Sequence, residues 1–145
     1  MIIDTTYLLP LARIRIDVDL LRTVADGKVG LKLEDIIVNS ISIFELQAKA
    51  AKLNVPVDYV IETVRAILKA FKIEDFHKPE IVRVANELRR LIPDYVDCVM
   101  VATAISLRDN LLTEDSLVLS LKEEIEERYG IRILRFHELV EKVNA

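Results

Sequence analysis

Segments with the apolar pattern of strands alternate with segments of helical spacing along nearly the whole chain. The strand-like segments fall at residues 1–3, 36–38, 72–76, 110–115 and 131–136. Between them, apolar side chains recur every three or four positions, the period of a helix that buries one face. Alternation of this kind is typical of a parallel sheet, because parallel strands need a crossover connection between them. We therefore predict an α/β fold in which helices cover both faces of a mostly parallel sheet.

Several helices are predicted in more detail. Tyr7, Leu8, Leu11 and Ala12 recur with helical spacing directly after the first strand. Two amphipathic helices within residues 41–72 predict a helical hairpin, whose paired faces offer an apolar groove to a partner or a second subunit. Residues 93–109 are mostly small and apolar, which predicts a buried helix. Residues 116–130 have the pattern of one amphipathic helix that Gly130 ends.

Length and composition limit the class of protein. The 145 residues, 52% of them hydrophobic, predict one compact domain over residues 1–145. The apolar runs are too short to span a membrane, so we expect a soluble, cytoplasmic protein without a membrane partner. The only cysteine, Cys98, has no partner for a disulfide or a zinc site and is expected to be a packed residue. A formal charge of −4 argues against nonspecific DNA binding through a basic surface but does not exclude a nucleic-acid enzyme.

Carboxylates occupy the predicted ends of strands and first turns of helices. Asp4 and Asp115 each follow a strand, and either can act as a helix cap. Glu45 lies three residues after Ser42, which is the spacing of a capping box. Asp94 is best explained as a cap, whereas Asp97, in the first turn of a very apolar helix, is harder to explain by capping alone.

A parallel sheet would gather these carboxylates along one edge, beyond the carboxyl ends of its strands. Crowded carboxylates raise one another's pKa and destabilise the fold unless a positive charge joins them. Oxygen ligands favour Mg²⁺ or Mn²⁺, whose bound water can act as a nucleophile. The acids therefore indicate a divalent-metal site, with helix capping as the alternative explanation for each one taken alone.

Four motifs in order along the chain resemble those of the PIN-domain ribonucleases, a family that includes the VapC-type toxins of toxin–antitoxin pairs. The motifs are IDTTYLL, SISIFELQAKA, YVDCVMVATAI and NLLTEDSLV, and together they span residues 2–118. The resemblance implies a three-layer α/β/α sandwich. It also implies an endoribonuclease that depends on Mg²⁺ or Mn²⁺, an RNA substrate, an antitoxin partner and a homodimer.

Carried over residue by residue, the resemblance implies that four acids form the metal site: Asp4, Glu45, Asp97 and Asp115. Thr113 would orient a carboxylate or water, and Thr5 resembles the hydroxyl residue that follows the first acid.

The sequence departs from the family at several positions. Thr6 stands where asparagine or serine is common, and Val118 replaces a frequent aromatic residue. Glu114 occupies a position that is basic or neutral in many relatives, where it either disfavours RNA binding or adds a contact around the metal.

Basic residues are needed to hold the phosphates of RNA. The candidates follow the first and second acids along the chain: Arg13, Arg15, Lys49 and Lys52. Solvent-exposed helix surface is the alternative explanation for all of them.

Two other functions remain open at the level of sequence. A catalytically silent PIN-like domain that works as a binding partner or scaffold would keep the same fold and acids. A phospho-acceptor receiver domain would also use acids and Mg²⁺, but it needs a central acceptor aspartate and a late lysine, and neither is evident.

Overall fold

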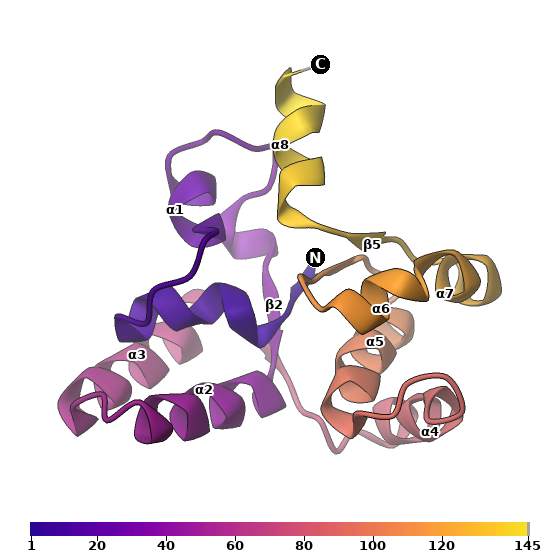
Figure 1. The fold of residues 1–145 in the computed structure, drawn as a ribbon, viewed down its shortest axis with the longest axis horizontal. Helices are drawn as coiled ribbons and strands as arrows, with labels where there is room; N and C mark the ends of the chain where they lie inside the picture. Colours follow the sequence, from indigo (N-terminus) through magenta and orange to yellow (C-terminus); the bar gives the residue numbers. More distant parts are fainter. Residues whose placement is uncertain (145) are drawn as a thin grey trace.

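The computed structural model describes residues 1–144 as a five-stranded sheet with helices on both faces (Figure 1). The strand order is β3-β2-β1-β4-β5, and every pairing is parallel. The strands are β1 (Ile2–Ile3), β2 (Ile37–Asn39), β3 (Lys72–Glu74), β4 (Leu111–Leu112) and β5 (Ile133–Leu134). The predicted α/β fold with a mostly parallel sheet is confirmed.

Helices connect the strands. The first part of the chain forms η1 (Thr5–Ala12), α1 (Leu20–Ala25), η2 (Leu33–Asp35), α2 (Ser40–Lys52) and α3 (Val57–Ala70), where η marks a 3₁₀-helix. The second part forms α4 (Pro79–Leu88), α5 (Tyr95–Leu107), α6 (Ser116–Ser120), α7 (Lys122–Tyr129) and α8 (Phe136–Asn144). Figure 1 shows α1, α2 and α3 on one side of β2 and α4 to α7 on the other.

The two faces of the sheet carry separate hydrophobic clusters. Ile3, Leu112 and Leu134 pack with η1, α1, α2 and α3, whereas the preceding residue of each strand, Ile2, Leu111 and Ile133, packs with α4, α5, α6 and α7. Successive residues of a strand point to opposite faces, so two consecutive apolar residues supply both clusters. This arrangement is the three-layer α/β/α sandwich. Cys98 is buried in the second cluster, as expected.

The predicted hairpin is confirmed as α2 and α3, and the predicted buried helix as α5, where every residue from Cys98 to Ala104 is buried. None of the helices within residues 1–144 is long and apolar enough to cross a membrane.

Two helical predictions need correction. The segment after β1 is a 3₁₀-helix, which Pro10 favours because its nitrogen cannot donate a hydrogen bond. The tighter winding buries Leu9 and leaves Leu11 partly exposed, whereas the predicted spacing placed Leu11 on the apolar face.

The predicted helix over residues 116–130 is two helices, α6 and α7, that meet at Leu121. The Ser120 hydroxyl donates a hydrogen bond to the Leu117 carbonyl at 2.6 Å, a local bond that competes with helical pairing. Gly130 ends α7 in the left-handed conformation, as predicted.

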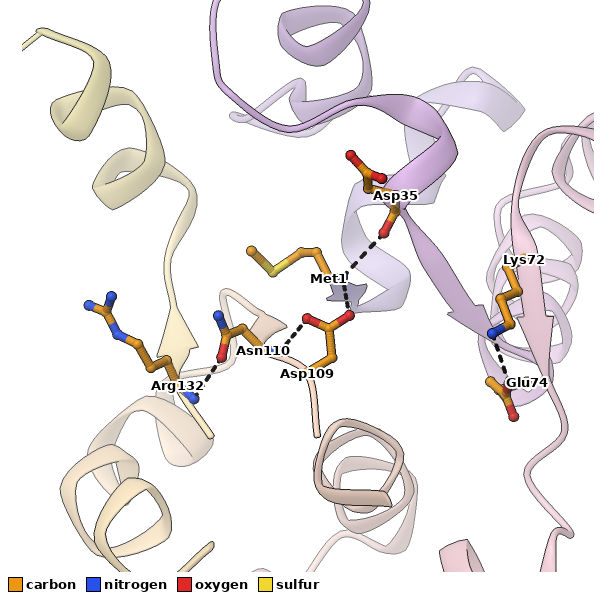
Figure 2. Close-up of polar contacts among 7 residues, drawn as sticks. All are labelled: Met1, Asp35, Lys72, Glu74, Asp109, Asn110 and Arg132. Atoms are coloured by element: carbon orange, nitrogen blue, oxygen red, sulfur yellow. Dashed lines mark hydrogen bonds and ion pairs between the residues drawn. The ribbon is translucent and has the colours of Figure 1, made fainter. Parts of the chain in front are cut away.

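The amino ends of the strands are tied together by polar contacts (Figure 2). The Met1 amino group, just before β1, contacts the Asp109 carboxylate before β4 and the Asp35 carbonyl before β2. The Arg132 amide, before β5, donates to the Asn110 side chain at 3.0 Å. On the outer strand β3, Lys72 pairs with Glu74 at 3.9 Å. These contacts lie at the amino edge of the sheet and on an outer strand, so the opposite edge is left for a site.

Candidate active site

A cleft of about 570 Å³ opens at the carboxyl edge of the sheet. Its lining residues come from η1 and α2 on one side and from α5 and α6 on the other, with the residues that precede these elements. The lining residues are Asp4, Thr5, Thr6, Leu9, Glu45, Lys49, Asp94, Asp97, Met100, Glu114, Asp115 and Ser116. All four acids predicted as metal ligands are among them. Position beyond the carboxyl ends of parallel strands is the usual location of a site in such a fold.

Asp4 follows β1 and is held through both carboxylate oxygens. One oxygen accepts from the Thr6 amide at 2.8 Å, so Asp4 does cap η1. The other accepts from the Thr113 hydroxyl at 2.6 Å. Thr113 is buried beneath the cleft, and its hydroxyl also accepts from the Asp115 amide at 3.1 Å. Thr113 therefore orients one acid and anchors the backbone of another, although it does not line the cleft itself.

Glu45 projects from α2 toward η1. The Thr5 hydroxyl donates to its carboxylate at 2.5 Å, which joins two of the predicted site residues across the cleft wall. Burial raises the pKa of Glu45, and the hydrogen bond from Thr5 opposes this effect.

The capping-box explanation for Glu45 is wrong. The helix α2 begins at Ser40, and its cap is Asn39, whose side chain accepts from the Ile41 amide at 2.9 Å. Ser42 therefore lies inside the helix, where it is buried. An earlier helix start leaves Glu45 in the second turn, free of any capping role.

Asp97 lies in the first turn of α5, which Asp94 caps through hydrogen bonds to the amides of Val96 and Asp97. The pKa of Asp97 is raised from 3.8 to about 7, first by burial and then by the charges of Asp115, Asp94, Asp4 and Glu45 in that order. Because the other three predicted ligands all raise this pKa, the four carboxylates share one electrostatic environment.

Asp115 follows β4 and caps α6 by accepting from the Val118 amide at 2.9 Å. Three acids of the cleft thus do cap helices: Asp4, Asp94 and Asp115. Capping leaves lone pairs on each carboxylate, since an ionised carboxylate can accept about four hydrogen bonds or ligand contacts. Capping and a role in the site are therefore compatible.

The sequence model of the PIN domain family matches residues 1–124. This chain belongs to the PIN domain family. No curated protein sequence matches the chain significantly.

Among solved structures, the PIN domain resembles a toxin–antitoxin complex from Klebsiella pneumoniae with 20% identity and a TM-score of 0.59 over 79% of this chain and 86% of that one. It resembles FitAcB from Neisseria gonorrhoeae with 18% identity and a TM-score of 0.63 over 92% of this chain and 95% of that one. It also resembles PAE2754 from Pyrobaculum aerophilum with 19% identity and a TM-score of 0.60 over 99% of this chain and 93% of that one. At these identities the likeness concerns the fold. The family match excludes the alternative that the chain is a phospho-acceptor receiver domain.

The donor set of the PIN domain suits a hard divalent cation. Within the described chain, no lysine or arginine forms an ion pair with any of the four acids: Asp4, Glu45, Asp97 and Asp115. Their charge is thus uncompensated, and carboxylate oxygens are the ligands that Mg²⁺ and Mn²⁺ prefer. Within residues 1–144, no three side chains of Asp, Glu, His or Cys are close enough together to hold a metal ion in their present positions. The residues fit the ion chemically, and binding would require the side chains to draw together.

Two further acids, Asp94 and Glu114, line the cleft beside the four predicted ligands. The cap predicted at Asp94 is confirmed, but its position in the cleft is not predicted. For Glu114 the sequence offers a contact around the metal as one of two alternatives. The Glu114 carboxylate accepts from the Phe136 amide at 3.4 Å, so it reaches the first residue of α8. Burial and the nearby charges of Glu114 and Asp4 raise the pKa of Tyr7, which keeps its hydroxyl neutral. The only signal in the sequence that Asp94 and Glu114 belong to the cleft is that they lie close along the chain to Asp97 and Asp115.

The four basic candidates have different surroundings. Lys49 lines the cleft. The Arg13 guanidinium stacks over the Tyr59 ring at 3.6 Å and lines a separate hollow with Arg15. Lys52, at the end of α2, is exposed and is not among the lining residues.

Proposed function

We propose that this PIN domain is an endoribonuclease that hydrolyses RNA phosphodiester bonds with Mg²⁺ or Mn²⁺. The observation that carries the proposal is the gathering of Asp4, Glu45, Asp97 and Asp115 in one cleft without a basic partner in the described chain. A stable fold has no reason to crowd such charges unless a cation or a reaction uses them.

The proposed division of labour follows from the contacts of each residue. Asp4, Glu45, Asp97 and Asp115 would hold the ion, which when bound polarises a phosphoryl oxygen and lowers the pKa of water. The Thr113 hydroxyl fixes the Asp4 carboxylate, and the Thr5 hydroxyl fixes Glu45. With a raised pKa, Asp97 exchanges a proton near neutral pH while no cation is bound. The binding of a divalent ion would therefore release a proton from this group.

We further propose that the protein is the toxin of a toxin–antitoxin pair. One structurally similar protein is a toxin–antitoxin complex. In this role the protein would bind an antitoxin as its protein partner and would form a homodimer. Its target would be cellular RNA in the cytoplasm. We also propose that residues 1–145 act as one domain.

The alternative function is a catalytically silent PIN domain that works as a scaffold. The two functions differ in whether the cleft acids support a reaction. Cleavage of a mixed pool of structured and single-stranded RNA with Mg²⁺ or Mn²⁺ distinguishes them.

The experiment compares the wild type with Asp97→Asn and with an EDTA control. Asp17→Asn is the matched control variant, because Asp17 is exposed in the loop between η1 and α1. We expect cleavage by the wild type and by Asp17→Asn, and loss of at least about 100-fold in Asp97→Asn or with EDTA. Folded wild type that binds Mn²⁺ but cleaves no RNA would favour the scaffold.

A further inference from the structure

We propose that Lys49 binds a phosphate group of the RNA next to the scissile one, and is the contact through which an acidic cleft holds a polyanion. This inference rests on the proposed ribonuclease function and deepens it. Lys49 would be a substrate-binding residue and would take no part in bond cleavage.

The lining of the cleft provides the first argument. Among the described residues that line it, six are acids and Lys49 alone is basic. RNA brings one negative charge per nucleotide, and proteins bind it by placing cations against its phosphates. A metal ion among the acids would account for the scissile phosphate only. A neighbouring phosphate needs a second cation at the same cleft, and within the described chain Lys49 is the side chain there to supply it.

The position of Lys49 on α2 provides the second argument. It lies four residues after Glu45, so both side chains project from the same face of the helix, one turn apart. Lys49 therefore stands next to the acids and farther from the strand ends. A phosphate bound by Lys49 would therefore lie one nucleotide along the RNA from a phosphate bound at the acids.

The availability of its ammonium group provides the third argument. Glu and Lys four residues apart on a helix commonly pair. Glu45 instead accepts from the Thr5 hydroxyl, and no ion pair of Lys49 with any residue in 1–144 lies within 4.0 Å. Lys49 is exposed and has no ion-pair partner in the described chain, although six acids line the same cleft. Its ammonium group is therefore available to contact a ligand.

The other basic candidates do not compete for this role. Arg13 is stacked over the Tyr59 ring, and together with Arg15 it lines a different hollow. Lys52 lies on the same helix as Lys49 and is likewise exposed, but it does not line the cleft. Lys52 is therefore a matched control, because it has the same charge and the same helix.

The test measures kcat and KM for cleavage of a short single-stranded RNA by the wild type, Lys49→Ala, Lys49→Arg and Lys52→Ala over a series of KCl concentrations. We expect Lys49→Ala to raise KM about tenfold with kcat nearly unchanged, because the lost contact is made equally in the ground and transition states. The slope of log(kcat/KM) against log[KCl] should become shallower by about 0.7, the value for one phosphate contact on a single strand. Lys49→Arg should restore both values, and Lys52→Ala should match the wild type.

Two further measurements separate this role from a structural one. The thermal midpoint of Lys49→Ala should match that of Lys52→Ala, because both side chains are exposed. Its Mn²⁺ affinity, by calorimetry, should equal or exceed that of the wild type, because removing a cation beside the acids cannot weaken metal binding. Equal KM and salt slope in Lys49→Ala and Lys52→Ala would overturn the Lys49 inference and leave the ribonuclease proposal standing. A wild type that cleaves no RNA would overturn both.

Discussion

At the scale of single residues, the unusual group of this PIN domain is the Asp97 carboxyl. Its pKa of about 7 means that the folded protein binds a proton more tightly here than the unfolded chain does. Between the unfolded pKa near 3.8 and the folded pKa near 7, stability therefore falls as the pH rises. Below that window both states are protonated, and above it both are ionised, with the folded state bearing the electrostatic cost.

The first prediction concerns Asp97→Asn in the absence of metal. The substitution removes an acid that repels its neighbours, so it should raise the unfolding free energy at pH 8 by about 1 kcal/mol, a figure reduced because solvent screens a half-buried carboxyl. The difference should shrink toward zero near pH 4. Thermal unfolding of both proteins with EDTA at several pH values measures it, with Asp17→Asn as the control. A difference that is constant from pH 4 to pH 8 would contradict the prediction.

At the scale of elements, a buried hydrogen bond joins the two sides of the site. The Asn39 side chain, at the end of β2, caps α2 with its oxygen and donates from its nitrogen to the Thr103 hydroxyl of α5 at 2.8 Å. Both residues are fully buried. The start of the helix that carries Glu45 is thus tied to the helix that carries Asp97, although these helices belong to opposite layers.

The second prediction is that Thr103→Val lowers the unfolding free energy by about 1–3 kcal/mol, since the change preserves shape but leaves the buried Asn39 amide without an acceptor. Urea unfolding measures this. The control is Thr23→Val, because the Thr23 hydroxyl bonds only the Asp19 carbonyl in the short helix α1. Equal effects of the two substitutions would show that the bond between the layers contributes little.

At the scale of the whole molecule, the α2–α3 hairpin presents an apolar surface to solvent. Val57, Ile61 and Leu68 recur on one face of α3 and are exposed, and Leu53 at the end of α2 is also exposed. Phe71, by contrast, is buried in the cluster beneath the hairpin. The hairpin therefore has one face in the core and a second that is free to meet another molecule, in line with the proposed homodimer.

The third prediction separates these two faces. Ile61→Glu combined with Leu68→Glu should convert the homodimer to a monomer in light scattering and change the thermal midpoint of a dilute sample little, because these side chains are 44% and 55% exposed. Phe71→Glu should instead unfold or strongly destabilise the chain, by about 3 kcal/mol or more, because it buries a charge in an apolar core. A wild type that is monomeric at high micromolar concentration would contradict the dimer. A double variant that keeps the mass of a dimeric wild type would show that the hairpin is not the interface.

Local sequence alone predicted most elements, whereas the choice of four acids as metal ligands came from the resemblance to a family and stays a prediction. Helical period, the runs of apolar strand residues and the caps at Asp94 and Asp115 depend on residues within about four positions, so they can be read without a structure. The single helix predicted over residues 116–130 was wrong, as was the capping box at Ser42 that was the alternative explanation of Glu45.

Only the tertiary structure decided which side chains meet. The bonds of Thr113 with Asp4 and of Asn39 with Thr103 join residues 109 and 64 positions apart, so no local pattern contains them. The order of the strands brings Glu114 and Asp94 to the acidic cleft. Lys49, one turn after Glu45 on α2, lines this cleft, whereas Lys52, at the end of the same helix, does not. The physical reason is that periodicity fixes which face of an element is buried, whereas the crossovers and packing of the layers fix which elements face one another.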